Sequence, residues 1–217
     1  MKASHAHPRA SALRGLYAVS SETLCRSAAD LLAGAAQALS GGAALIQYRD
    51  KWNDAATRAR HAHALLGLCR EYGAMLIIND DVELAARCGA DGVHVGAGDT
   101  PLAEARARLG PEAVIGVSCS NSLERALAAQ DGGADYIAFG RYFPSRTKPD
   151  APAADAGLLP AARTRLRLPV CVIGGITPDN APALIAQGAD LVAAVEGVFG
   201  AADIEAAARA YARLFAR

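Results

Sequence analysis

The sequence predicts an α/β fold, a single (β/α)8 barrel. The chain alternates eight short apolar runs, rich in β-forming residues, with stretches that have helical spacing. Eight such units in 217 residues fit a compact barrel. Three helix-to-strand junctions, at residues 89–91, 133–135 and 188–190, share the spelling Gly-Ala-Asp, which indicates a repeated joint. A doubly wound sheet is the alternative, but it usually has fewer strands and a glycine-rich turn after the first, where this chain has Ser-Ser-Glu.

The strands are expected where apolar runs begin, and the helices where apolar residues recur every three to four positions. The helical pattern is clearest in residues 24–39, 55–69 and 204–215. Pro101 marks the first turn of one helix, which Asp99 or Thr100 could cap. Residues 140–157 form a long loop rich in proline and charge, of the kind that often carries function. The eight runs begin near Gly15, Ala43, Met75, Gly92, Val114, Tyr136, Val170 and Leu191.

Composition and charge limit the kinds of function that the chain is expected to have. The 22 basic and 22 acidic residues balance, which argues against nucleic acid or membrane as a partner. Residues 1–14 lack the apolar run of a signal peptide, so we expect a disordered tail before a catalytic barrel of residues 15–217. The five cysteines form no metal-type cluster and are interpreted as reduced thiols of a cytoplasmic protein. We expect small-molecule substrates, and a homo-oligomer is compatible with the sequence.

Polar residues after the second run indicate an anion site. Barrel enzymes place their chemistry at the carboxyl ends of the strands. The second run leads into Gln47, Arg49 and Lys51, which share one face if the strand continues, because strand side chains alternate. Arginine supplies a planar fork and lysine a point charge for an anion. The alternative is ordinary solvated charge at a strand end.

Aspartates after the third and fourth runs predict a metal site. Asp80 follows the third run and Asp99 follows the fourth. Neighbouring parallel strands lie about 4.8 Å apart, so both carboxylates can reach one cation. Proteins typically hold Mg²⁺ by one or two carboxylates together with substrate phosphate oxygens and water. A helix N-cap is the alternative for each aspartate, and the two roles can coexist.

Later segments predict a monophosphate site. Residues 145–148 (Ser-Arg-Thr-Lys) follow the sixth run and bring two hydroxyls and two cations. Gly174 and Gly175 follow the seventh run, where barrels often bind phosphate through backbone N–H groups, although the pair could simply make the turn. Ser118 ends the fifth run, and no histidine or acid lies at triad spacing from it. His94, inside the fourth run, is interpreted as a packed, hydrogen-bonded residue. Two anion sites without a nucleophile indicate displacement of diphosphate by a second substrate.

These residues carry a resemblance over about residues 15–215. The chain resembles thiamine phosphate synthase in an ordered series of motifs. They are Gly15-Leu16-Tyr17, Gln47-x-Arg49-x-Lys51, Ile77-Ile78-Asn79-Asp80, Gly92-Val93-His94-Val95-Gly96 with Asp99-x-Pro101, Ile115-Gly116-Val117-Ser118, Phe139-Gly140, Phe143-Pro144-Ser145-x-Thr147-Lys148-x-Asp150-Ala151 and Ile173-Gly174-Gly175-Ile176.

The resemblance implies a reaction and a role for each matching residue. Hydroxymethylpyrimidine diphosphate would condense with thiazole phosphate to give thiamine phosphate and diphosphate, with the pyrimidine C–O bond ionising first. Asp80 and Asp99 would hold Mg²⁺. The catalytic residues would be Arg49, Lys51, Asn79, Ser118 and Lys148. The substrate-binding residues would be Gln47, Tyr48, Arg49, Asp50, Lys51, Asn79, Ser118, Ser145, Arg146, Thr147, Lys148, Gly175, Val195 and Glu196.

The chain departs from the family pattern at several positions. The family usually has threonine at Ser145, Gln-Glu at Ala97-Gly98 and proline at Arg141. Glu196 is the largest departure, because the family typically has serine there and a carboxylate repels a phosphate. We expect either that only the Glu196 N–H is used or that thiazole phosphate binds more weakly. The rival functions are a thiazole tautomerase-like barrel and a non-catalytic thiazole phosphate-binding barrel.

Overall fold

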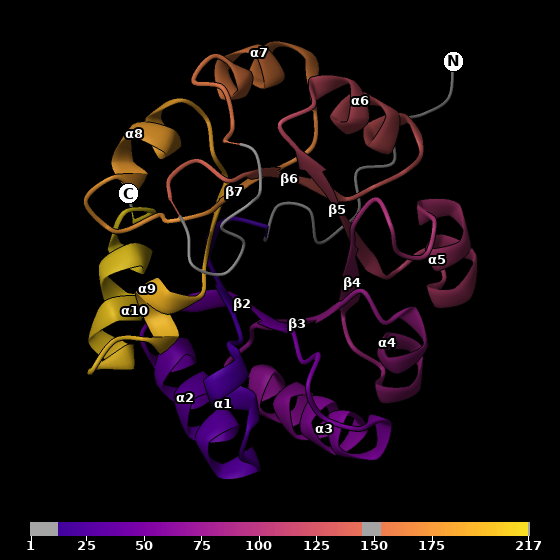
Figure 1. The fold of residues 1–217 in the computed structure, drawn as a ribbon, viewed down its shortest axis with the longest axis vertical. Coiled ribbons are helices and arrows are strands. Elements are labelled where there is room, and N and C mark those ends of the chain that lie inside the picture. The colour runs from indigo at the N-terminus through magenta and orange to yellow at the C-terminus, as the bar shows by residue number, and fades with distance from the viewer. Residues whose placement is uncertain (1–12, 145–152, 217) are drawn as a thin grey trace.

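A computed structural model describes residues 13–144 and 153–216 and shows a closed barrel of parallel strands. The strands pair in chain order, and the last pairs with the first. Each strand begins at the residue from which the sequence predicts it, so the predicted (β/α)8 fold is confirmed (Figure 1). The strands are β1 (Gly15–Val19), β2 (Ala43–Tyr48), β3 (Met75–Asn79), β4 (Gly92–Val95), β5 (Val114–Ser120), β6 (Tyr136–Gly140), β7 (Val170–Ile173) and β8 (Leu191–Ala194).

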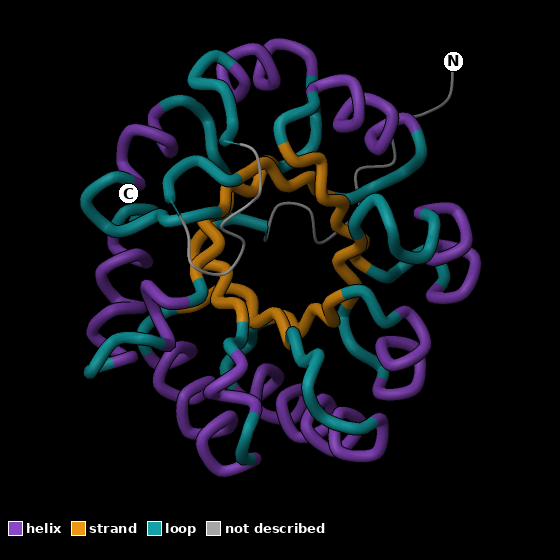
Figure 2. Tube along the Cα trace, viewed as in Figure 1, coloured by secondary structure: helices purple, strands orange, loops and turns teal. Residues whose placement is uncertain are grey.

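The helices form a ring outside the strands (Figure 2). Many of them begin at a serine or aspartate whose side chain accepts a backbone N–H, as Ser122 and Asp203 do. The sequence expects Asp99 or Thr100 to cap the helix after β4, and this is wrong because the N-cap residue is Pro101. The helices are α1 (Glu22–Cys25), α2 (Ala28–Ser40), α3 (Ala55–Glu71), α4 (Val82–Cys88), α5 (Leu102–Leu109), α6 (Leu123–Asp131), α7 (Leu158–Arg165), α8 (Ala181–Ala186), α9 (Glu196–Phe199) and α10 (Ile204–Arg213).

Two apolar clusters divide the core. The larger fills the space between the strands and the helices, and the smaller fills the barrel interior with side chains such as Tyr17, Met75 and Tyr136. Leu13 belongs to the interior cluster and is only 1% exposed, although the sequence assigns it to the loose tail. The interior cluster therefore includes a residue that precedes β1.

The three Gly-Ala-Asp junctions are equivalent joints, as their shared spelling predicts. The carboxylate of Asp91 accepts the N–H of Leu76 in β3, and that of Asp135 accepts the N–H of Ile115 in β5. Asp190 bonds in the same way to Val170 in β7. Each aspartate precedes an even-numbered strand and satisfies a backbone group at the start of the preceding odd-numbered strand. The joints therefore tie neighbouring strands together at their amino ends.

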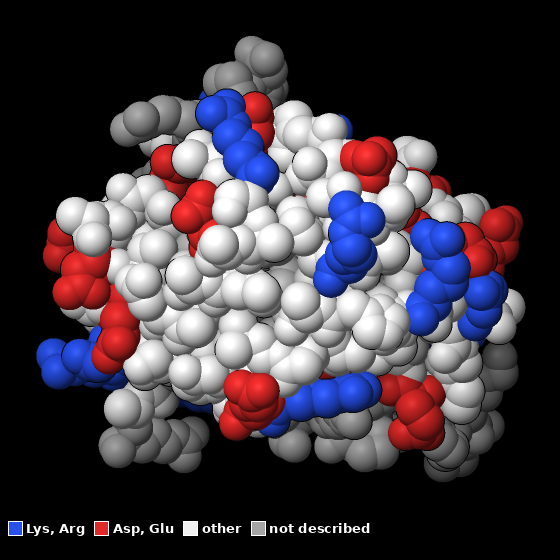
Figure 3. All heavy atoms as spheres, turned by 90° about the horizontal axis from the view of Figure 1, so that it is seen from below, with Lys and Arg blue, Asp and Glu red and all other residues white. Residues whose placement is uncertain are grey.

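The cysteine thiols are interior groups, and charge on the surface is mixed in sign. All five cysteines are buried and free, and burial raises the pKa of the Cys69 and Cys119 thiols to about 12. On the face shown in Figure 3, basic and acidic side chains lie interspersed rather than segregated. Within the described residues, no helix combines the length and the hydrophobicity needed to cross a membrane.

Removing the Asp135 carboxylate should destabilise the barrel. Asp135 also pairs with Arg106 at 2.6 Å, and its side chain is only 9% exposed. Asp135→Ala leaves the buried Ile115 N–H without this acceptor and removes one of several acceptors of the Arg106 guanidinium, so we expect the free energy of unfolding to fall by about 3 kcal/mol. That corresponds to roughly 6–12 °C in the melting temperature of a chain this long. The control is Asp203→Ala, which removes an exposed helix cap worth about 1 kcal/mol. Equal shifts for the two variants would contradict the role of the joint.

Candidate active site at the carboxyl ends of the strands

The functional candidates from β2, β3 and β4 converge on one rim of the barrel. Lys51 follows β2, Asp80 follows β3, and the Lys51 Nζ lies 2.9 Å from the Asp80 Oδ2. Asn79 also hydrogen-bonds the Asp80 carboxylate. Burial pushes the pKa of Asp80 upward, but the Lys51 ammonium and the neighbouring hydrogen bonds outweigh it and hold that pKa below its ordinary value. Asp80 is therefore a stable carboxylate.

The backbone of Asp80 is strained in a way typical of functional sites. Its φ is 62°, in the left-handed region that non-glycine residues adopt rarely and aspartate tolerates best. The Asp80 N–H donates to the His94 carbonyl at 2.9 Å, which anchors this turn to β4. Asp81, one residue later, is the N-cap of α4. The helix-cap alternative for Asp80 is thus taken by its neighbour, and the Asp80 carboxylate remains at the rim.

Asp99 brings a second carboxylate to the same place. Its Oδ2 accepts the Gly96 N–H at 2.8 Å, which folds the loop after β4 back on itself. The carboxyl groups of Asp80 and Asp99 are in hydrogen-bonding contact. Burial, together with the neighbouring Asp80, raises the pKa of Asp99 above its ordinary value, although the Gly96 N–H opposes this. The shifts are opposite in direction, so Asp80 ionises more readily than Asp99, and a bound cation would relieve the repulsion between the two carboxylates.

The donor chemistry of this pair fits Mg²⁺. Within residues 13–144 and 153–216, no group of three or more His, Cys, Asp or Glu side chains forms a closed metal cage. Mg²⁺ does not need such a cage, because it commonly takes one or two carboxylates and completes its shell with water and phosphate oxygens. Asp80 and Asp99 supply those carboxylates, and Lys51 stands beside them to neutralise further anionic charge.

Arg49 is held at the rim by its backbone and by an aromatic neighbour. Ser20, at the end of β1, accepts the Arg49 N–H at 2.8 Å and donates to its carbonyl at 3.0 Å. The guanidinium carbon lies 5.5 Å from the centre of the Trp52 ring, within cation–π range. Trp52 is 44% exposed, so this stacked pair faces solvent. Arg49 and Lys51 lie in the loop beyond β2, rather than on one face of a continuing strand.

The side chains of Tyr48 and Asp50 bond to groups of the protein away from the rim, so the predicted contact of these two residues with substrate would have to use their backbone. The Tyr48 hydroxyl donates to Asp50 at 2.7 Å and lies 3.3 Å from His61 Nδ1 on α3. Asp50 also accepts the N–H groups of Trp52 and Asn53, both at 3.0 Å. Its side chain is fully buried behind the strand. Asp50 instead shapes the loop that carries Lys51.

A chain of polar side chains crosses the barrel interior below this rim. Gln47 Nε2 donates to the Tyr17 hydroxyl at 2.7 Å, and Tyr17 lies 2.9 Å from the Tyr136 hydroxyl. Tyr136 lies 3.0 Å from His94 Nδ1, and His94 Nε2 lies 2.9 Å from Ser118 Oγ. The packed, hydrogen-bonded role expected of His94 is confirmed. The spacing argument that leaves Ser118 without a histidine is wrong, because strand pairing brings the two together.

Sequence reasoning missed Tyr17 and Tyr136 as members of this chain. Both are essentially inaccessible, and burial raises the pKa of each phenol well above the ordinary value. Each of these tyrosines lies inside an apolar run, and this could have drawn attention to them, because a buried tyrosine hydroxyl usually requires a hydrogen-bond partner. That signal shows that a partner exists but does not identify it.

Only part of the predicted monophosphate site falls within the described residues. Residues 145–148, which include Ser145, Arg146, Thr147 and Lys148, lie outside the described residues. Gly175 has φ 61°, and a Cβ there would lie 2.3 Å from the Pro144 carbonyl oxygen. Its glycine is thus required by the close approach of the loop after β6, which supports the turn interpretation. Val195 and Glu196 begin α9 beyond β8, where Glu196 is exposed and its carboxylate lies beside Gly200.

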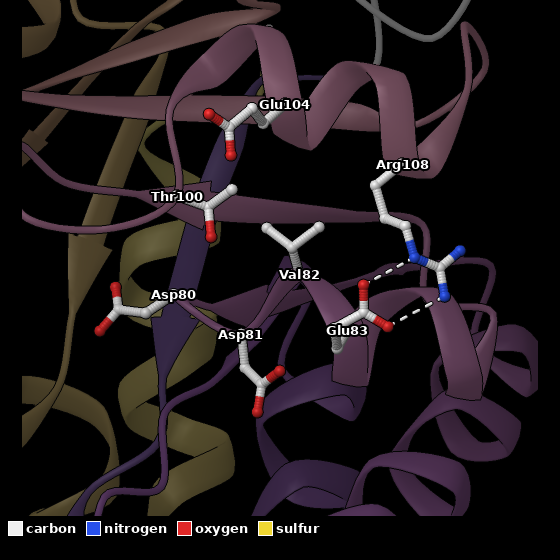
Figure 4. Close-up of a pocket in the computed structure, with 7 residues that line it drawn as sticks. All are labelled: Asp80, Asp81, Val82, Glu83, Thr100, Glu104 and Arg108. Carbon is white, nitrogen blue, oxygen red and sulfur yellow. Dashed lines mark hydrogen bonds and ion pairs between the residues drawn. The ribbon is translucent and has the colours of Figure 1, made fainter.

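Two cavities of the described structure border the rim, one lined in part by Asp80 and the other in part by Ser118. One of about 430 Å³ lies between α4 and α5, and its lining is dominated by acidic residues (Figure 4). Its one cation, Arg108, is bound by Glu83 through two hydrogen bonds, and Asp80 points away from that pair. This groove is unsuited to a diphosphate. The other, of about 420 Å³, is lined mainly by small and apolar residues and includes Ser118.

Comparisons with known proteins agree on one family. The family profile described as thiamine monophosphate synthase matches residues 16–198. The thiamine-phosphate synthase of Thioalkalivibrio sulfidiphilus is 55% identical over 203 residues, covering 94% of this chain and 96% of the relative. That of Nitrosococcus oceani is 51% identical, covering 94% of each chain.

Comparison with a solved structure supports the same family. The thiamine phosphate pyrophosphorylase from Pyrococcus furiosus superposes with a TM-score of 0.85 at 32% identity, and the match covers 94% of this chain and 96% of that one. Sequence and structure thus agree over nearly the whole barrel. We conclude that the chain is an enzyme of the transferase class and belongs to the thiamine monophosphate synthase family.

Proposed function

We propose that this enzyme makes thiamine phosphate by a Mg²⁺-dependent condensation. The substrates are 4-amino-2-methyl-5-hydroxymethylpyrimidine diphosphate and 4-methyl-5-(2-phosphooxyethyl)thiazole, and diphosphate is released. The observation that carries the proposal is the cluster of Lys51, Asp80 and Asp99 at adjoining strand ends. Paired carboxylates beside a lysine, with an arginine in the same loop as the lysine, are groups suited to a metal-bound diphosphate.

The diphosphate is held by cations at the mouth of the barrel. Arg49 presents its guanidinium on the Trp52 ring, and Lys51 extends from the loop that Asp50 shapes. Asn79 adds a neutral donor next to Asp80. Lys148, in the loop after β6, is proposed to complete the diphosphate site, whereas Ser145, Arg146 and Thr147 are proposed to contact the thiazole phosphate; these four residues lie outside the described residues. Arg49, Lys51 and Lys148 stabilise charge that grows on the leaving group.

Asp80 and Asp99 would hold Mg²⁺. When bound there, the ion supplies positive charge against the diphosphate oxygens. The Lys51 ammonium already lies 2.9 Å from Asp80, so it can contact a diphosphate bound there without a large movement. Burial of Asp80 and Asp99 strengthens these charge interactions relative to bulk water.

The bond changes follow from the leaving group. The pyrimidine C–O bond breaks first, and the diphosphate leaves with the electron pair. The thiazole nitrogen then donates its lone pair to the resulting cation and forms the new C–N bond. No protein nucleophile is required. Gln47 and Ser118 are proposed to position the pyrimidine, because they are the two ends of the polar chain beneath the rim.

The thiazole phosphate is proposed to bind near Gly175, Val195 and Glu196. The Glu196 carboxylate lies along its own helix beside Gly200, which leaves the backbone of Val195 and Glu196 as the contacting part. This arrangement reduces the repulsion between the carboxylate and the phosphate but does not remove it.

The deciding assay supplies both substrates with Mg²⁺ and measures thiamine phosphate by chromatography. Stoichiometric thiamine phosphate and diphosphate are the expected products. If none forms but thiazole phosphate isomerises, the protein is a tautomerase-like barrel. If thiazole phosphate only binds, the protein is a non-catalytic binding barrel.

Asp80→Asn should weaken Mg²⁺-dependent turnover. The amide keeps the shape of the side chain but removes half of the paired negative charge that would attract the cation. We expect at least a tenfold higher Mg²⁺ concentration for half-maximal activity. The matched control is Asp81→Asn, one residue away, whose carboxylate caps α4 instead. An unchanged Mg²⁺ dependence in Asp80→Asn would sink the metal role.

Glu196→Ser should lower the KM for thiazole phosphate. At a few ångströms in water-like surroundings, the repulsion between two unit charges is about 1 kcal/mol, which corresponds to about a fivefold change. Glu205→Ser, at an exposed site on α10, is the control for a general change in net charge. Steady-state kinetics with varied thiazole phosphate measure the effect. A large loss of activity would show that the Glu196 carboxylate has a positive role.

A further inference from the structure

We propose that Tyr17, Tyr136 and His94 form a relay of hydrogen bonds that sets the polarity of Ser118 and makes its hydroxyl a donor toward substrate. The three are positioning residues, because they act through Ser118. The inference rests on the proposed function for the identity of the substrate, but the relay itself is a property of the free enzyme.

The relay is a continuous path across the barrel. It starts at Gln47 on β2, passes through Tyr17 on β1 to Tyr136 on β6, and continues through His94 on β4 to Ser118 on β5. Each link is between 2.7 and 3.0 Å long. Gln47, Tyr17, Tyr136 and His94 are all at most 8% exposed. Burial leaves these groups to satisfy one another, since unpaired polar atoms in an interior are costly.

One glycine makes the path geometrically allowed. Gly116 on β5 lies between His94 on β4 and Tyr136 on β6 in the strand register. A Cβ at Gly116 would lie 2.0 Å from the Tyr136 Cζ and 2.4 Å from its hydroxyl oxygen. The absence of a side chain there lets the Tyr136 ring pass over β5 and stack on His94, with ring centres 5.5 Å apart.

The direction of the relay follows from its first donor. Gln47 donates an N–H to the Tyr17 oxygen, and either phenol could be the donor between Tyr17 and Tyr136. The proposed direction has Tyr17 donate to Tyr136, because the opposite order would leave the Tyr17 hydrogen without a partner within the relay. Tyr136 must then donate its own hydrogen to His94 Nδ1. A neutral imidazole that accepts at Nδ1 carries its proton on Nε2 and donates to Ser118 Oγ. High phenol pKa values keep both tyrosines protonated, so neither can break this order.

The relay determines the direction in which the Ser118 hydroxyl donates. Ser118 Oγ receives the His94 hydrogen, so its own hydrogen points away from the relay, and Ser118 is partly exposed. Ser118 then offers a donor to a hydrogen-bond acceptor. The ligand it selects is an aromatic heterocycle with an unprotonated ring nitrogen, rather than one whose ring nitrogen carries hydrogen.

The histidine tautomer in the free enzyme tests the relay. Enzyme labelled with ¹⁵N-histidine is examined by long-range ¹H–¹⁵N correlation at about pH 9, where imidazole is ordinarily neutral. His94→Gln assigns the His94 signals. We expect His94 as the Nε2–H tautomer. A His94 ring found as the Nδ1–H tautomer would overturn the proposal regardless of whether the enzyme makes thiamine phosphate.

Reversing the first donor should reverse the relay. Gln47→Glu replaces an amide donor with a carboxylate that only accepts, so Tyr17 must donate to it and His94 should change to the Nδ1–H tautomer. Gln47→Met, of similar length, leaves the end of the relay without either group and should give a mixture. His61 is the internal control, because it contacts Tyr48 outside the barrel and should not change. An unchanged His94 tautomer in a folded Gln47→Glu enzyme contradicts the proposal.

Tyr17→Phe tests the functional consequence without replacing Gln47 or Ser118. It keeps the ring that packs edge-on against Tyr136 and removes the hydrogen bonds of the Tyr17 hydroxyl to Gln47 and to Tyr136. If the proposed function holds, we expect the KM for the pyrimidine diphosphate to rise roughly fivefold, the factor for one neutral hydrogen bond. The KM for thiazole phosphate should stay the same. Equal changes in both KM values, or none, would show that the relay does not reach the substrate.

Discussion

The closure of the parallel sheet in chain order is the constraint on which the site depends. All eight strands point the same way, so the residues that follow them are gathered on one rim. Closure also makes the interior narrow, and an eight-stranded barrel has room for side chains alone. Polar groups that point inward must therefore find partners among one another. The paired carboxylates on the rim and the polar chain beneath it both follow from this geometry.

The same closure explains which features could be predicted from the sequence. The start of every strand was predictable because apolar runs, helical spacing and punctuating glycines are local signals. The meeting of Asp80 with Asp99 was predictable because consecutive strands are neighbours in a barrel. Lys51 reaches Asp80 as well, although the supposed strand periodicity ends at Tyr48 and a loop carries it there. The sequence thus predicted correctly that Lys51 lies at this rim, but it predicted wrongly that a continuing strand places it there.

The features that could not be predicted depend on contacts between distant parts of the chain. Tyr17 and Tyr136 are 119 residues apart, and their contact requires both the closed barrel and the gap left by Gly116. Alternation along β2 places Tyr48 away from the barrel interior, but only the hydrogen bonds to Asn53 and Trp52 show that Asp50 turns away too. Local patterns specify which residues are polar, and packing decides which of those residues meet.

Contacts that stabilise the fold lie at the amino ends of the strands, and the candidate functional groups lie at the carboxyl ends. At the amino ends, the aspartates of the repeated joints each accept a backbone N–H at the start of a neighbouring strand. At the carboxyl ends, the same type of residue is placed at a cost, with Asp80 in a left-handed conformation and in contact with a second carboxylate. Such an arrangement persists only if the rest of the fold holds it in place. The joints at the opposite end contribute to the stability of that fold. Aspartate thus stabilises strand contacts at one end of the barrel and supplies candidate binding groups at the other.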